Sequence, residues 1–277
     1  IMDTWMTSSI SPQLSSGGIN QDLCDDSERH NKLFPADLRP QAHEIIRTWA
    51  FYTIVKSYLH QNEIPWKNLM ISGWCLASDK TKMSKSKGNV VTPINLIKEK
   101  GSDIVRYWAS TSHLGTDTAY SEDVFKVGQK LTTKLFNAAK FASMNFDIFE
   151  EGGKPKTILK DTDSQNINQI ADFWILSRLK EVIKSSEEQF DKFEYAKARE
   201  IIEDFFWNDF CDNYLEIVKV RAYGLSATKY QDQYLTEDQK NKIILEQKSA
   251  IFTLYHVLEG ILKLFAPFIP HISEEIY

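Results

Sequence analysis

Cysteine is scarce in this chain of 277 residues. Its three cysteines, Cys24, Cys75 and Cys211, lie far apart and form no C-x-x-C pair. Disulfide frameworks and zinc knuckles need closely spaced cysteines, and isolated cysteines suit a reducing compartment. The sequence therefore predicts no protein-bound metal and a cytoplasmic location, with Cys211 as a small buried residue of a helix.

Long uncharged apolar runs are also missing. The most apolar region, residues 251–270, is interrupted by His256, Glu259 and Lys263, whereas a membrane-spanning helix needs about 20 mostly apolar residues. No signal peptide opens the chain, and no internal repeat or low-complexity segment occurs in it. We therefore expect a soluble monomer that does not associate with membranes.

An excess of positive charge is lacking as well, because the net charge is −5. No overall basic field attracts the chain to nucleic acid, so a contact with a polyanion must come from a local patch. The 42% of hydrophobic residues is typical of a globular protein. The chain opens on IMDTWMTSS without an initiator methionine, from which we expect an internal piece of a longer protein.

The first part of the chain contains a polar segment, a segment with helical spacing of apolar residues and a short apolar run, in that order. Residues 15–32 are polar and aperiodic, which predicts a surface loop. Apolar residues then recur at helical spacing over 40–59, and Pro40 suits the first turn of a helix. The apolar run 68–76 is short and predicts a buried strand. Strand and helix in succession indicate an α/β layer.

Helical signals dominate after this layer. Thr92 and Pro93 supply an N-cap and a first helical residue, for a helix that ends near Gly101. A second short helix follows over 102–108, and a longer one begins after Ser121. Residues 152–165 are rich in Gly, Asp, Thr and Lys and predict a domain boundary.

Beyond this boundary, three long amphipathic helices are predicted, at 171–190, at 195–223 and after the capping box formed by Thr236 and Gln239. In the last of them, apolar residues alternate in steps of three and four, which is the spacing of a helical bundle. We expect Pro267 and Pro270 to end it. The predicted domains are 1–100, 101–160 and 161–277.

The most unusual stretch is TKMSKSKGNVV, residues 81–91, which follows the predicted strand. It places Lys82, Lys85 and Lys87 in a Ser- and Gly-containing loop, with Lys80 just before it. A mobile loop of lysines suits a triphosphate, because ammonium groups can stabilise the charge that grows on the β- and γ-oxygens when a bond to the α-phosphorus breaks. The alternative is a lysine-rich turn that only faces water.

The letters KMSKS, residues 82–86, resemble the second signature of the class I aminoacyl-tRNA synthetases, and the extension KMSKSKGNVVTP resembles their valyl, isoleucyl and leucyl branch. The resemblance implies that Lys82 and Lys85 bind the phosphates of ATP, which carries Mg²⁺, and stabilise the departing pyrophosphate during amino-acid adenylation. It also implies that Met83, Ser84 and Ser86 shape this ATP-binding loop.

Two further stretches, DTWMTSS at 3–9 and DLRPQAHEIIRTWAFYT at 37–53, are similar to the valine-specific members of this branch. This similarity implies L-valine and tRNA(Val) as substrates. It places Trp5 and Trp49 in the wall of the amino-acid pocket, and it places Glu44 near the substrate ammonium or the ribose. For each tryptophan the alternative is core packing, and Ala42 and Glu44 depart from the commoner Gly and Asp. His43 is given no catalytic role.

The helical part resembles the anticodon-binding bundle of the same family, through KLFNAAKF at 134–141, FWNDFCDNYLEIVK at 206–219 and FAPFIPHISEEIY at 265–277. The implied fold class is therefore α/β plus all-α: the C-terminal half of a Rossmann-like catalytic domain followed by a helical bundle. The His-x-Gly-His first signature and the editing domain are absent, so we expect this chain alone to form no adenylate. Isoleucyl or leucyl ligases and a non-catalytic tRNA-binding paralogue remain alternatives.

A second group of positive charges lies on the helix that leads toward this bundle. Lys126, Lys130 and Lys134 are spaced four apart and therefore share one helix face. Like charges at this spacing weaken a helix slightly, and we expect no acidic partner for them. We predict that they contact tRNA phosphates, while the alternative is a face that is simply solvated.

Overall fold

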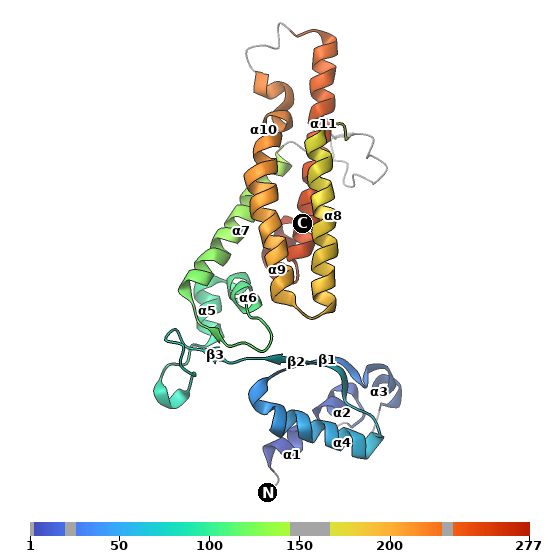
Figure 1. Ribbon diagram of the computed structural model, residues 1–277, viewed down its shortest axis with the longest axis vertical. Coiled ribbons are helices and arrows are strands. Elements are labelled where there is room, and N and C mark those ends of the chain that lie inside the picture. Colours follow the sequence, from blue (N-terminus) through green and yellow to red (C-terminus); the bar gives the residue numbers. More distant parts are fainter. Residues whose placement is uncertain (1–2, 20–25, 145–166, 229–234) are drawn as a thin grey trace. The chain divides into compact units, whose positions relative to one another are not determined.

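The computed structural model describes residues 3–19, 26–144, 167–228 and 235–277. It divides into two compact units, shown in Figure 1. Unit 1 comprises Ile1–Val91 and Ser112–Tyr120, and unit 2 comprises Thr92–Thr111 and Ser121–Tyr277. The boundary predicted at 152–165 and Cys24 lie outside the described residues. The three-part domain division therefore stays a prediction.

Unit 1 is built around two pairs of parallel strands. In the first pair, β1 (Ala36–Ala42) lies beside β2 (Trp66–Ser72), with Ala36 opposite Trp66 and Ala42 opposite Ser72. In the second pair, β3 (Cys75–Leu76) lies beside β4 (Thr118–Ala119). The helical segments of unit 1 are α1 (Thr4–Ser8), α2 (Ser11–Ser16), α3 (Ser27–Leu33), η1 (His43–Ile45), η2 (Ile46–Ala50), α4 (Phe51–Gln61) and η3 (Lys85–Lys87).

The helix predicted to begin at Pro40 begins later. Pro40 lies in β1, opposite Met70 of β2, and regular α-helix starts only at Phe51, after the short turns η1 and η2. Within the described sheet β1 has one neighbour only, and proline is tolerated in such an edge strand because its missing N–H is not needed. The residue before a proline also favours extended backbone. The prediction was therefore wrong for 40–42 only, whereas helical structure over 43–59 is confirmed, as a 3-10 helix, a π-helix and an α-helix in succession.

The strand predicted at 68–76 is present but interrupted. It divides at Gly73 into β2 and β3, because the segment around Thr116 passes against the chain there. A Cβ on Gly73 would lie 2.1 Å from the carbonyl oxygen of Thr116, so only glycine fits at this crossing. The chain then changes its pairing partner from β1 to β4.

The loop predicted at 15–32 contains a helix. Ser27–Leu33 forms α3, and the Asp26 carboxylate accepts a hydrogen bond of 3.1 Å from the backbone N–H of Arg29. This N-cap satisfies one of the free N–H groups at the start of a helix. The helix is only seven residues long, which is too short for a period to be read from its side chains.

Unit 2 is helical. Three of its helices come before the undescribed residues 145–166: α5 (Pro93–Lys100), α6 (Ser102–Ser110) and α7 (Glu122–Ser143). The predicted N-cap position Thr92 and the end at Gly101 are confirmed. The later segments are α8 (Ile170–Asp191), α9 (Tyr195–Asp204), η6 (Phe205–Tyr214), α10 (Leu215–Tyr223), η7 (Gly224–Thr228), α11 (Glu237–Phe265) and α12 (Pro270–Ile276).

The long helices of unit 2 lie side by side, as Figure 1 shows for α8, α10 and α11. The predicted helix 171–190 corresponds to α8, and 195–223 is one continuous helical stretch made of α9, η6 and α10. The capping box at Thr236 and Gln239 is present at the start of α11. Apolar side chains of these helices form one large buried cluster that includes Phe206, Phe210 and Phe265. The predicted α/β part and all-helical part are thus confirmed.

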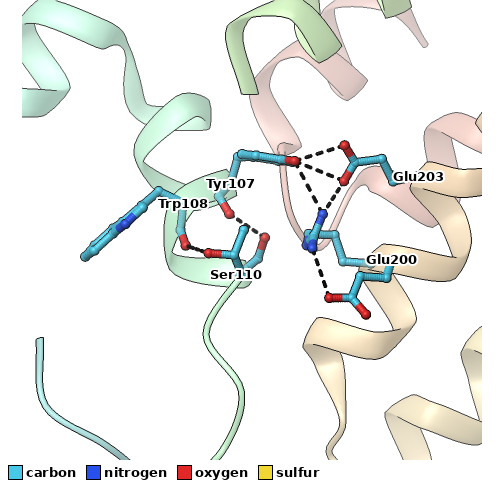
Figure 2. A network of polar contacts seen from close by, with 7 residues as sticks. Tyr107, Trp108, Ser110, Glu200 and Glu203 are labelled. Atoms are coloured by element: carbon cyan, nitrogen blue, oxygen red, sulfur yellow. Dashed lines mark hydrogen bonds and ion pairs between the residues drawn. The ribbon is translucent and has the colours of Figure 1, made fainter. Parts of the chain in front are cut away.

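Polar side chains join α6 to α9 inside unit 2. Figure 2 shows the Tyr107 hydroxyl directed at the Glu203 carboxylate, to which it donates at 2.9 Å. Arg199 pairs with the same carboxylate, and its guanidinium lies 5.2 Å from the centre of the Tyr107 ring. Burial, followed by the charge of Glu203, raises the pKa of Tyr107. This buried network fixes α6 against the bundle helices.

Candidate functional site

The basic loop lies between a strand and a helix, as the sequence predicted. It leaves β3, and Leu76 forms an antiparallel bridge with Lys82. At the turn between them, the Asp79 carboxylate accepts hydrogen bonds from the backbone N–H of Thr81 at 3.0 Å and from its hydroxyl at 2.7 Å. Lys80 takes a positive φ of 60° in this turn. The start of the loop is therefore fixed by a hairpin-like turn.

One side chain closes the loop at its other end. The amide oxygen of Asn89 accepts from the backbone N–H of Ser84 at 2.9 Å, while its nitrogen donates to the Thr81 hydroxyl at 3.1 Å and to the Lys82 carbonyl at 3.3 Å. Next to it, Gly88 has a φ of 68°, which favours glycine. Sequence reasoning missed Asn89, although an asparagine after Gly in a turn is a known signal for such local bonds.

The other predicted loop residues lie along this closed turn. Met83 and Ser84 are half-buried, Ser86 is exposed, and the Ser84 and Ser86 hydroxyls lie 3.1 Å apart. Lys85 is the first residue of the short helix η3. Their predicted roles toward ATP stay predictions.

Lys82, which the resemblance assigns to the ATP phosphates, and Glu44, which it assigns to the substrate ammonium or the ribose, are brought together. The Lys82 ammonium lies 2.8 Å from Oε2 of Glu44 and 4.5 Å from the centre of the Trp74 ring. The indole N–H of Trp74 donates to the same carboxylate oxygen at 3.1 Å. Hydrogen bonds from Lys82 and then Trp74 lower the pKa of Glu44 below its usual range. Sequence reasoning missed Trp74, because a tryptophan in an apolar run is usually a core residue.

His43 lies beside this group without joining it. Its Nδ1 is 3.2 Å from the carbonyl oxygen of Ser72, and its ring centre is 4.9 Å from that of Trp74. The first contact is a hydrogen bond to the backbone of β2, and the second is a contact between rings. They give His43 a part in placing the Trp74 ring.

The predicted pocket residues Trp5 and Trp49 belong to one cluster. Trp49 is 4% exposed, its ring is stacked on Trp66 with centres 5.5 Å apart, and its indole N–H donates to the carbonyl of Ser8 at 3.2 Å. Trp5 is half-buried against the same cluster. These contacts are those of core packing for Trp49, and its place in a pocket wall stays a prediction.

The three predicted tRNA-binding lysines lie on α7, but they differ from one another. Lys126 lies 3.0 Å from the Asp123 carboxylate, so the expectation that it lacks an acidic partner was wrong. An aspartate one turn earlier in the same helix supplies that partner. Lys130 is exposed and Lys134 half-buried. Among the described residues no carboxylate pairs with either of these two.

Two family models match the chain, and the first of them covers unit 1 together with residues 92–111 and 121 of unit 2. Residues 1–121 match the family described as tRNA synthetases class I (I, L, M and V), and residues 172–277 match the anticodon-binding domain of tRNA ligase. Over all 277 residues the chain is 53% identical to the valine–tRNA ligase of Rickettsia felis and 54% identical to that of Rickettsia prowazekii. The chain is therefore similar to class I tRNA synthetases over residues 1–121 and to their anticodon-binding domain over residues 172–277. It spans 30% and 32% of the length of these two relatives.

Solved structures of class I synthetases share the fold. The Mycobacterium tuberculosis methionyl-tRNA synthetase in complex with methionyl-adenylate superposes with a TM-score of 0.70 at 21% identity, covering 96% of this chain and 48% of that one. The Agrobacterium radiobacter LeuRS–tRNA–LeuAMS ternary complex gives a TM-score of 0.63 at 20% identity, covering 99% and 30%. At such identities the likeness concerns the fold. It confirms the predicted fold class, an α/β part followed by a helical bundle.

The described residues hold neither a metal-binding cluster of side chains nor a helix suited to cross a membrane. Within 3–19, 26–144, 167–228 and 235–277, no group of His, Cys, Asp or Glu side chains is arranged to bind a metal ion. No helix of the same residues is long and apolar enough to cross a membrane. Cys211 is buried as predicted, and burial raises the pKa of its thiol to about 12. The candidate site is therefore the basic loop with the group around Glu44.

Proposed function

We propose that this chain is part of a valine–tRNA ligase, which joins L-valine to ATP to give valyl-adenylate and pyrophosphate and then transfers valine to tRNA(Val). The observation that carries the proposal is the identity of 53% to a Rickettsia valine–tRNA ligase over the whole chain. The lysine-rich loop between a strand and a helix also supports the proposal, because its positive charges suit the phosphates of ATP.

In the proposed reaction, the valine carboxylate attacks the α-phosphorus of ATP and the bond to the β-phosphate oxygen breaks. Negative charge then accumulates on the leaving pyrophosphate. Lys82 and Lys85 would donate to its oxygens, and such charge stabilisation is the main form of catalysis in phosphoryl chemistry. Mg²⁺ enters bound to ATP and supplies further positive charge.

The remaining residues would bind the other substrates. Trp5 and Trp49 border the apolar valine pocket, and Glu44 receives the valine ammonium or a ribose hydroxyl. Lys130 and Lys134, with a smaller share from Lys126, contact tRNA phosphates. In this proposal residues 1–100 belong to the catalytic domain, 101–160 connect it to the tRNA stem region, and 161–277 belong to the bundle that binds the anticodon.

The test is amino-acid-dependent exchange between pyrophosphate and ATP, measured for the complete ligase and for the 277-residue chain. The complete ligase should respond to valine far more than to isoleucine or leucine, and the chain alone should show no exchange. Exchange driven by isoleucine or leucine would assign the chain to another branch member. A complete protein that binds tRNA but activates no amino acid would be a non-catalytic paralogue.

A further inference from the structure

The contact between Lys82 and Glu44 is incompatible with the roles that the proposed reaction gives to these two residues. The Lys82 ammonium lies 2.8 Å from the Glu44 carboxylate, although the proposed function needs the same ammonium on a phosphate. Glu44 is likewise occupied, since one of its oxygens accepts from both Lys82 and the indole N–H of Trp74. Both groups must therefore exchange partners when substrates bind.

Trp74 is held in place independently of these two groups. Its backbone N–H donates to the Asp117 carboxylate at 2.8 Å, and the strands on either side of it are β2 and β3. Gly73 allows the chain around Thr116 to approach closely. The indole has the Glu44 carboxylate at its N–H and the Lys82 ammonium 4.5 Å from the centre of its ring, and the centre of the His43 ring lies 4.9 Å from it.

The ion pair between Lys82 and Glu44 is weak enough for a substrate to break it. The side chains of Lys82 and Glu44 are 54% and 45% exposed, and an exposed ion pair changes an equilibrium by only about 1.5- to 5-fold. A polyphosphate carries several negative charges and can bind more than one lysine of the loop. It therefore competes successfully with a single carboxylate for the ammonium of Lys82.

We propose that Glu44 and Trp74 form a latch for Lys82, which keeps this lysine away from the phosphate site until a polyphosphate removes it and thereby frees the Glu44 carboxylate. Phosphate binding then prepares Glu44 for its own cationic or hydroxyl partner. This inference rests on the proposed function, because it takes a triphosphate as the ligand of the loop. It adds an order of events to that function.

The test uses inorganic tripolyphosphate and isothermal titration calorimetry on the complete ligase. Glu44→Gln removes the latch, so tripolyphosphate should bind about threefold more tightly. The matched control is Asp37→Asn, which removes the same charge from another exposed ion pair of unit 1, Asp37 with Lys67 at 2.7 Å. This control should leave the affinity unchanged. In a Lys82→Met background, Glu44→Gln should also have no effect, because a direct pair needs both partners.

A second measurement follows the latch itself. The indole N–H resonance of Trp74 is assigned by its loss in Trp74→Phe, and it should move when Lys82→Met removes the ammonium. Saturating tripolyphosphate should move it in the same direction in the parent ligase and leave it unmoved in Lys82→Met. These shifts report contact with Lys82, which a general loss of stability would not reproduce.

The outcomes separate the latch from the proposed function. If Lys82→Met weakens tripolyphosphate binding while Glu44→Gln behaves like Asp37→Asn, the latch is wrong and the phosphate role of the loop stands. If Lys82→Met leaves the affinity unchanged, or the parent binds no tripolyphosphate, the phosphate role fails and the latch fails with it. If the indole N–H resonance of Trp74 does not move in Lys82→Met, the latch is wrong, whatever the tripolyphosphate affinities are.

Discussion

At the scale of single residues, Trp49 carries two expectations that experiments can separate. It is buried, stacked on Trp66 and covered by the Arg39 guanidinium, 3.7 Å from the centre of its ring. Replacing a buried aromatic residue by alanine costs about 3–5 kcal/mol. Trp49→Ala should therefore lower the free energy of unfolding of unit 1 by this amount, as measured by denaturant titration, and the half-buried Trp5→Ala should cost less.

The same substitution also tests the valine pocket. A small apolar pocket separates valine from isoleucine by only about 1–3 kcal/mol, so Trp49→Ala in the complete ligase should reduce this discrimination in amino-acid-dependent exchange. If specificity stays the same while stability falls, Trp49 is a core residue and the pocket wall lies elsewhere.

The sequence identified some residues of the site and missed others for a physical reason. Lys82 and Glu44 were found because charged residues in a family signature are readable one by one. Their contact with each other, and the part of Trp74 in it, depends on the approach of two segments 38 positions apart in the chain. Contacts between distant segments, such as those of Lys82 and Trp74 with Glu44, leave no period or motif in the sequence. Asn89 is different, because it was missed although its signal is local.

At the scale of secondary-structure elements, the bundle is joined by one buried polar group. Asp172 of α8 is fully buried, and its carboxylate receives two bonds from Arg221 of α10, at 2.6 and 2.9 Å. It also accepts from the hydroxyls of Tyr214 at 2.8 Å and Ser249 at 2.5 Å. These bonds connect α8 with η6, α10 and α11. They specify how the four segments pack.

Removing this carboxylate should be costly, because the half-buried Arg221 guanidinium would remain without its partner. Breaking a buried ion pair in this way costs about 3–5 kcal/mol. We expect Asp172→Ala to lower the free energy of unfolding of unit 2 by that amount, as measured by chemical denaturation. The control is Glu216→Ala, which breaks an exposed pair with Lys219 and should cost about 1 kcal/mol or less. Equal effects would show that Asp172 contributes no more than a surface charge.

The face of α7 that carries Lys126, Lys130 and Lys134 allows another test at this scale. If these lysines bind tRNA phosphates, changing all three to Gln should weaken tRNA binding for any tRNA sequence. The slope of log affinity against log salt should fall by about 1 for each lysine that no longer binds a phosphate. Lys126 should contribute least, because it already pairs with Asp123.

The matched control is the pair Lys32→Gln and Lys67→Gln, two exposed lysines of unit 1 that lie outside α7 and outside the proposed anticodon-binding bundle. Their slope should equal that of the parent. Identical slopes for the triple variant and the parent would mean that the face on α7 only faces water.

Element types were predictable to different degrees. The helices α8 and α11 follow from apolar periods sustained over 22 and 29 residues, and a capping box marks the start of α11. The start of α4 was misplaced because Pro40 suits both a first helical turn and an edge strand. Only the neighbouring strand β2 decides between them. The break at Gly73 likewise depends on Thr116, which lies far along the chain.

At the scale of the whole molecule, unit 1 exposes surfaces that isolated domains usually cover. Parallel sheets normally have several strands and are buried on both faces. Each of the two parallel sheets described here has only two strands. On α4, Phe51, Tyr58 and Leu59 are exposed. The chain spans about a third of the length of its valine–tRNA ligase relatives. These observations support the expectation that unit 1 forms the complete ATP site only together with other parts of such a ligase.

The most direct test of the account is single-turnover formation of valyl-adenylate by the complete ligase, in the parent and in Lys85→Ala. The parent should form valyl-adenylate from valine and ATP. Loss of one charge that acts in the transition state should slow this step by about 10²-fold or more, while the affinity for valine hardly changes. A control substitution at the exposed Lys67 should leave the rate unchanged. A parent that forms no valyl-adenylate, or a Lys85→Ala variant that forms it as fast as the parent, would contradict the account.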